Sequence, residues 1–139
     1  MGVLLSLVAQ AVLLLAAFVY VFYGYCEDYC DKPDRTFWGA VDAALPYGLV
    51  GLVAMVGACY LLMRQPRTPR PSIARAVLMG SWFTVAFLAG LPTVAWLLAL
   101  IANPDVGAFL AVLFLVPTWT ASLLAAARRA GRPAAERRL

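Results

Sequence analysis

The chain has 139 residues, of which 64% are hydrophobic and only 13% are charged, with a formal net charge of +4. A soluble domain of this length needs a more polar surface, so the composition indicates a membrane protein. Histidine is absent, which excludes His-ligated zinc or copper, haem held by two histidines and a histidine general base. No catalytic or cofactor-binding motif occurs, so we expect a non-enzymatic protein without a cofactor or metal.

Four apolar runs divide the chain, and each is close to the roughly 20 residues that a helix needs to cross a bilayer. We predict spans at residues 3–25, 37–63, 76–102 and 106–127. The spans occupy most of the chain, which leaves a single membrane domain. The predicted fold is all-α, with four transmembrane helices in an antiparallel bundle.

The first span has Gln10 as its most polar residue. Its apolar run is too long for the core of a secretory signal and no small-residue cleavage site follows it, so we expect a retained helix. The simpler interpretation of Gln10 is a hydrogen bond to a neighbouring helix. A role in a transport path is the alternative.

Residues 26–38 form the first loop, which contains Cys26 and Cys30. Two nearby thiols in an oxidising compartment usually form a disulfide, so we predict a bond between these cysteines. As free thiols the pair would instead support a thiol redox or soft-metal function, because thiolates favour soft ions.

The second span contains Asp42, the only acidic residue within a predicted span, and intramembrane carboxylates are costly enough to suggest a function. Pro46 has no N–H, so the carbonyl of Asp42 loses its helical partner. Residue 42 thus offers two hard oxygen ligands, and with Gln10 it forms a candidate ion or proton site. The simpler interpretation places Asp42 about one turn below the interface, paired with Arg35 or Lys32.

Small residues recur along one face of the second span, at Ala40, Ala44, Gly48 and Gly51. We call these four residues the small-residue stripe. Such a stripe lets two helix backbones approach closely. Packing within the bundle is the simpler use. Packing against a second copy or another membrane protein is the functional alternative.

Basic residues gather in the loop at residues 64–75 and in the tail at residues 128–139, which together hold nine of the eleven lysines and arginines. The positive-inside rule places both segments and both termini in the cytoplasm, with residues 26–38 outside. The arginine-rich composition favours a bacterial source and hence the plasma membrane. Anionic headgroups are the expected partner rather than nucleic acid, because both segments adjoin the membrane. The expected headgroup contacts are Arg64, Arg67, Arg70, Arg75, Arg128 and Arg129.

Two functions from different classes fit this sequence. The first is a non-catalytic accessory or interaction subunit of a larger membrane assembly, which the small-residue stripe and the short loops favour. The alternative is a small oligomeric channel or transporter that uses Asp42, favoured also by Pro46, Pro92 and Pro117 within the spans. The thiol redox or soft-metal function is a weaker alternative.

Overall fold

The computed structural model describes residues 1–25, 37–64, 71–101 and 103–131. These residues form four α-helices and no strand: α1 (Gly2–Tyr25), α2 (Phe37–Met63), α3 (Ile73–Ala99) and α4 (Pro104–Gly131). All four are long and apolar enough to cross a membrane. The predicted all-helical fold and the number of candidate spans are therefore confirmed.

Local chemistry explains where α3 and α4 begin. Ser72 has extended backbone angles, φ −65° and ψ 128°, and directly precedes α3. The helix therefore begins three residues earlier than the predicted span. Pro104 occupies the first position of α4, where a missing N–H costs nothing because that group has no helical partner. The last turn of α4 contains Arg128 and Arg129. Their positive charges stabilise the helix there, because the C-terminal end of the helix dipole is negative.

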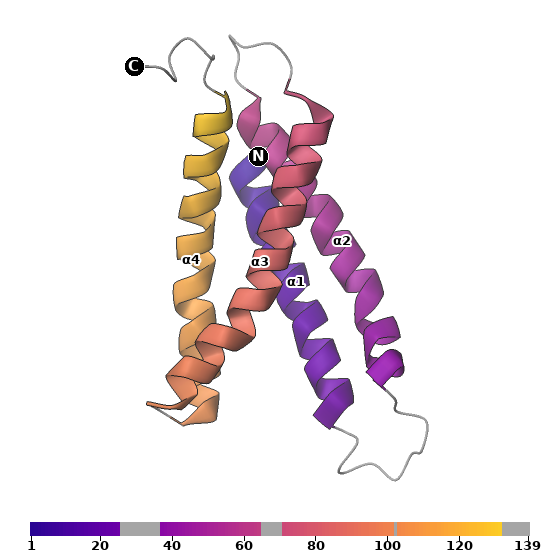
Figure 1. Ribbon diagram of the computed structural model, residues 1–139, viewed down its shortest axis with the longest axis vertical. Helices are drawn as coiled ribbons and strands as arrows, with labels where there is room; N and C mark the ends of the chain where they lie inside the picture. The colour runs from indigo at the N-terminus through magenta and orange to yellow at the C-terminus, as the bar shows by residue number, and fades with distance from the viewer. Residues whose placement is uncertain (26–36, 65–70, 102, 132–139) are drawn as a thin grey trace.

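The helices α1 and α2 lie side by side (Figure 1), and glycines set how closely they approach. A Cβ atom built on Gly51 would lie 2.7 Å from Cγ of Leu13, and one on Gly57 would lie 3.2 Å from Cδ2 of Leu5. Such distances show that side chains of α1 already occupy the space beside these glycines. We call α1 and α2 the first helix pair.

The helix α3 changes its neighbour along its length. Near its start, Gly80 packs against α2, where an added Cβ would lie 2.7 Å from Cα of Val56. Near its end it packs against α4, where a Cβ on Gly107 would lie 2.9 Å from the backbone nitrogen of Ala99. The second helix pair, α3 and α4, therefore leans away from the first pair, and the two pairs splay apart at one end (Figure 1).

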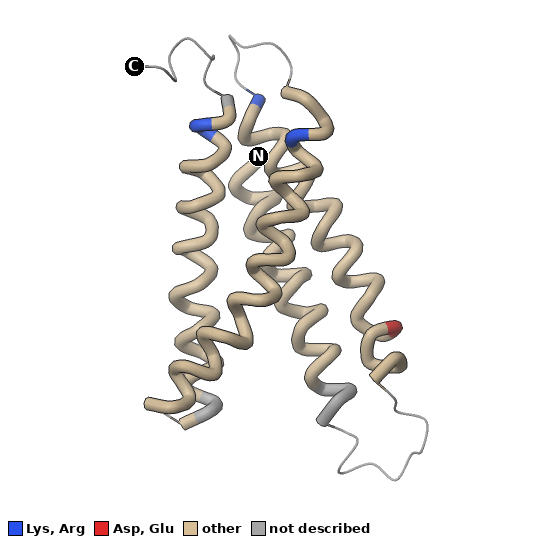
Figure 2. Tube along the Cα trace, in the orientation of Figure 1, with Lys and Arg blue, Asp and Glu red and all other residues tan. Residues whose placement is uncertain are grey.

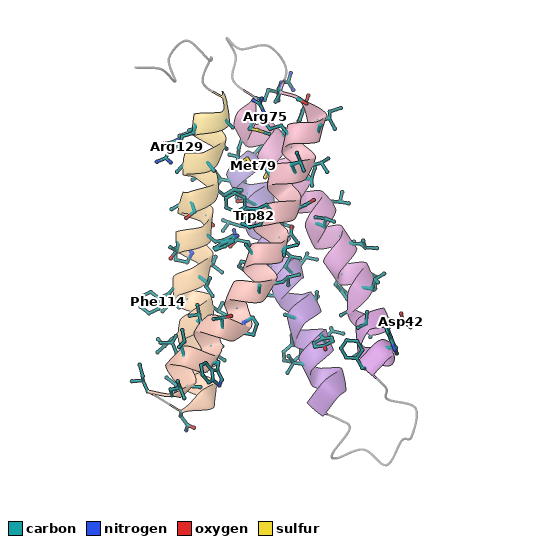
Figure 3. The ribbon with its side chains drawn as sticks, in the orientation of Figure 1. Asp42, Arg75, Met79, Trp82, Phe114 and Arg129 are labelled. Carbon is teal, nitrogen blue, oxygen red and sulfur yellow. The ribbon has the colours of Figure 1, made fainter. Side chains whose placement is uncertain are left out.

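The two ends of the molecule differ in charge. Figure 2 shows the described basic residues at the end where the pairs converge, while Asp42 lies towards the other end (Figure 3). We call the basic end the arginine end. We call the half of the molecule that contains the arginine end the closed half. Buried residues form a hydrophobic cluster there, which consists of Ala9, Leu13, Met55, Cys59, Met63, Ala76, Phe87, Leu123 and Ala127.

Candidate functional site: an apolar groove between the helix pairs

A groove of about 590 Å³ lies between the two helix pairs, in the half of the molecule farther from the arginine end. All four helices contribute to its walls. Its lining residues are Ala16, Ala17, Tyr20, Val21, Val41, Ala44, Leu45, Gly48, Leu88, Leu91, Pro92, Ala95 and Ala108. Apart from the phenol of Tyr20, these side chains are entirely hydrocarbon, so the groove offers dispersion contacts rather than hydrogen bonds.

Small side chains keep the groove open. Gly48 of α2 has no atom within 4 Å of the position that a Cβ would occupy. Alanines at positions 16, 17, 44, 95 and 108 form much of the remaining wall. Pro92 lies in the wall of α3, and because it lacks an N–H, the carbonyl of Leu88 has no partner in the regular helix ladder.

Two side-chain hydrogen bonds connect α4 to other helices, one to the first helix pair and one to its own partner α3. Nε2 of Gln10 donates a hydrogen bond to Oγ1 of Thr120 over 3.0 Å, which connects α1 to α4. Nε1 of Trp119 donates to the carbonyl of Phe83 over 3.2 Å, which connects α4 to α3. The ring of Phe87 packs 6.1 Å from that of Trp119. Farther from the arginine end, the two helix pairs diverge (Figure 1).

Gln10 is 1% exposed and forms the interhelical hydrogen bond that its sequence position suggested. Its Oε1 has no hydrogen-bond partner among the described residues. Thr120 donates its own hydroxyl to the carbonyl of Val116 over 2.8 Å, so the amide joins a chain of hydrogen bonds that ends on the α4 backbone. Gln10 is therefore a structural contact between helices, and it does not line the groove.

Asp42 is exposed on α2 and points away from α1 and from the space between the helix pairs (Figure 3). Because Leu5 lies beside Gly57 and Leu13 beside Gly51, Gln10 is level with a point near residue 53 of α2. Asp42 is eleven residues from that point, or about 17 Å along the axis at 1.5 Å per residue. The structure therefore does not bring Asp42 and Gln10 together.

The small-residue stripe divides between two environments. Ala40 is buried, and Gly51 packs against Leu13 of α1, so these positions serve packing within the bundle. Ala44 and Gly48 instead line the groove. Only this second part of the stripe is open to a binding partner.

Four of the six predicted headgroup residues are described, and all four are exposed: Arg64, Arg75, Arg128 and Arg129. They lie together at the arginine end (Figures 2 and 3). Arg67 and Arg70 lie outside the described residues. Aromatic rings gather at the opposite end, where the ring of Phe37 makes edge contacts with Tyr20 at 6.3 Å and with Trp38 at 5.4 Å. Basic residues at one end and aromatic rings at the other match the pattern expected of two membrane interfaces.

The predicted disulfide between Cys26 and Cys30 also lies outside the described residues and stays a prediction. Cys59 is a free, buried thiol in the closed half of the molecule. In the part of the chain that the structure describes, no group of three or more cysteine, aspartate or glutamate residues is placed to hold a metal ion.

Hydroxyl groups on the outer surface of the helices are satisfied locally. Thr93 donates to the carbonyl of Ala89 over 2.8 Å, and Ser122 donates to the carbonyl of Thr118 over 2.8 Å. Large apolar side chains are exposed on the same helices, including Trp82 and Phe114 (Figure 3), which are 71% and 62% exposed. Such a surface suits hydrocarbon surroundings, because the hydroxyl groups of Thr93 and Ser122 are already hydrogen-bonded to the helix backbone.

No protein-family model, curated protein or solved structure matches this chain. The functional argument therefore rests on the groove. Sequence reasoning did not identify Ala16, Ala17, Leu91 or Ala95 as site residues. Pro92 was the one signal in the sequence for this site, since it lies in the segment of α3 that lines the groove. The residues of α1 on the opposite wall could not be predicted, because they depend on how the helices pack.

Proposed function

We propose that this protein is a non-catalytic accessory subunit of a larger membrane assembly, and that the groove is its interaction site. The observation that carries this proposal is an apolar groove walled by all four helices, with Gly48 open at its surface. Lipid tails give helices no hydrophobic drive to associate, so binding within a membrane depends on close packing at small residues. The open part of the small-residue stripe, Ala44 and Gly48, provides such a surface.

The channel or transporter alternative receives less support from the geometry. Asp42 faces away from the groove, and the buried Gln10 is already hydrogen-bonded to Thr120. An ion path needs polar groups that line a common passage. The groove provides only the phenol of Tyr20 among its lining residues.

The Gly48→Leu variant tests the interaction site. A leucine at this position meets no atom near its Cβ, so the protein should fold normally while the new side chain fills the groove. We expect the variant to remain monodisperse in mild detergent and to lose at least 90% of a component that co-purifies with the wild type. Gel filtration with mass spectrometry of the eluted complex measures both properties.

The matched control is Ala125→Leu, which adds the same kind of side chain at an exposed position of α4. It should retain the co-purifying component. Equal retention by Gly48→Leu and wild type would contradict the proposal that the groove is the interaction site.

We further propose that the four helices form an antiparallel bundle in a bacterial plasma membrane, with the arginine end in the cytoplasm. The exposed arginines support this orientation, because basic residues are retained on the cytoplasmic side. Anionic lipid headgroups are their proposed partner, at about 1 kcal/mol for each basic residue near the surface.

Ser72 and Asn103 test this orientation, because both are exposed and they flank different ends of α3. In a background where the native cysteines are replaced by serine or alanine, Asn103→Cys should react with an impermeant maleimide in intact cells. Ser72→Cys should react only after the membrane is permeabilised. The reverse labelling pattern would overturn the proposed orientation.

A further inference from the structure

Proline interrupts both helices of the second pair, at Pro92 in α3 and at Pro117 in α4. Proline has no N–H, and its ring clashes with the carbonyl four residues earlier, so it removes a helix hydrogen bond and makes a bend at that turn easier. The turns affected are residues 88–92 of α3 and residues 113–117 of α4. Each helix therefore has one turn that resists bending less than the others.

A threonine follows each proline and forms a further bond to the same turn. Thr93 donates to the carbonyl of Ala89 over 2.8 Å, and Thr118 donates to the carbonyl of Phe114. Hydroxyl bonds to the carbonyl four residues earlier slightly destabilise a helix and often bend it. The effects of proline and of threonine thus fall on one turn in each helix.

These two weakened turns lie side by side. A Cβ atom built on Gly90, in the middle of the turn in α3, would lie 3.8 Å from Cδ2 of Leu115, in the middle of the turn in α4. Two helices that bend at the same level can bend together without sliding past each other. We call residues 88–92 and 113–117 together the proline hinge.

On the side of the arginine end, the second pair is fixed to the first. Thr120, three residues after Pro117, accepts the hydrogen bond from Gln10 of α1. All buried residues of α3 precede the proline hinge, namely Ala76, Gly80, Thr84 and Phe87. The closed half therefore cannot bend without losing core contacts.

On the other side of the proline hinge, α3 and α4 hold each other. No described residue of α3 is buried there, but a Cβ on Gly107 would lie 2.9 Å from the backbone nitrogen of Ala99. Figure 1 shows this end of the second pair leaning away from α1 and α2. We call residues 93–99 of α3 and 104–112 of α4 the outer tip. Its close internal packing favours movement as one body.

We propose that the outer tip swings as a unit about the proline hinge and that this movement sets the width of the groove. Ala95 and Ala108 of the outer tip line the groove together with Ala17 and Ala44 of the first pair. A swing towards the first pair narrows the groove, and a swing away widens it. The inference rests on the proposed function for what the groove takes, and it adds how the site closes on a partner and releases it.

Distances between two spin labels, measured by double electron–electron resonance on the full chain in nanodiscs, test this movement. In a background without native cysteines, Leu97→Cys carries a label on the outer tip and Val50→Cys carries one on α2, both at exposed positions. The control labels are at Leu78→Cys, on α3 in the closed half, and Val50→Cys. The outer-tip distribution should be about twofold broader than the control, because freezing traps every position of a hinge that moves in microseconds to milliseconds.

Replacing both Pro92 and Pro117 with alanine should narrow the outer-tip distribution about twofold, because alanine restores the N–H that completes each helix turn. The matched control is Pro46→Ala, which makes the same substitution in α2, away from the proline hinge. It should leave the distribution unchanged.

A wild-type outer-tip distribution as narrow as that of the control labels would overturn the proline hinge, and this comparison needs no proline variant. An undiminished width in the folded double variant would overturn it as well. If Gly48→Leu still loses the co-purifying component, the interaction site stands and only the hinge fails. If the hinge behaves as expected while Gly48→Leu keeps that component, only the proposed function fails.

Discussion

Replacing Gly80 with alanine is expected to destabilise the protein by about 1–3 kcal/mol, the usual cost of overpacking a core. The added Cβ would lie 2.7 Å from Cα of Val56 and 3.0 Å from its backbone nitrogen. These are backbone atoms, so rotation of a side chain cannot relieve the contact and α2 must move away from α3. Gly80→Leu should prevent these two helices from packing altogether. Unfolding in mixed micelles with increasing sodium dodecyl sulfate, followed by tryptophan fluorescence, measures the effect.

Gly90→Ala is the matched control, because it makes the same substitution in the same helix. There the added Cβ would lie 3.8 Å from Cδ2 of Leu115, which is an ordinary contact. Alanine is favoured over glycine inside a helix by about 0.5–1 kcal/mol, so this variant should be slightly more stable than the wild type. A Gly80→Ala protein as stable as Gly90→Ala would show that α2 and α3 do not pack as described.

Gly51→Leu should destabilise the first helix pair by about 1–3 kcal/mol, and Leu13→Ala should relieve part of that loss. The Cβ of residue 51 would lie 2.7 Å from both Cγ and Cδ2 of Leu13, a side chain that is fully buried and cannot swing into the bilayer. Leu13→Ala alone leaves a cavity and costs about 2–5 kcal/mol. In the double variant the new leucine occupies that cavity, so the two effects should fall short of their sum by about 0.5–3 kcal/mol.

Gly48→Leu provides the comparison for this double-mutant cycle. It lies one turn away on the same helix and faces the groove rather than Leu13. Combined with Leu13→Ala, its effect should be additive within about 0.3–0.5 kcal/mol. The same micelle unfolding measurement applies. Additivity in the Gly51 cycle as well would mean that Gly51 and Leu13 are not in contact.

The small-residue stripe shows what the sequence could and could not predict. Spacing of about four places its members on one face of a helix, and that face can be read from the sequence alone. Which neighbour covers each position depends on how the helices tilt. Here α1 covers Gly51 with Leu13, while the lean of α3 leaves Gly48 in an open groove. No feature within α2 distinguishes these two glycines.

The candidate ion or proton site shows a similar limit. Asp42 and Gln10 attract notice because each is a polar residue in an apolar run, but composition does not reveal their relative heights in the bundle. The partner of Gln10 is Thr120, which lies 110 positions away in the chain. The four helices themselves follow from long apolar runs and could be predicted directly, because a membrane demands such runs wherever a helix crosses it.

The splay of the helix pairs gives the molecule the outline of a wedge, narrow at the arginine end and broad at the other (Figure 1). A wedge that spans a bilayer displaces more lipid area from one leaflet than from the other. The bilayer relieves this imbalance by bending so that the leaflet holding the broad end lies on the convex side. In the proposed orientation that leaflet is the outer one, so the shape itself would favour membrane that bulges outward.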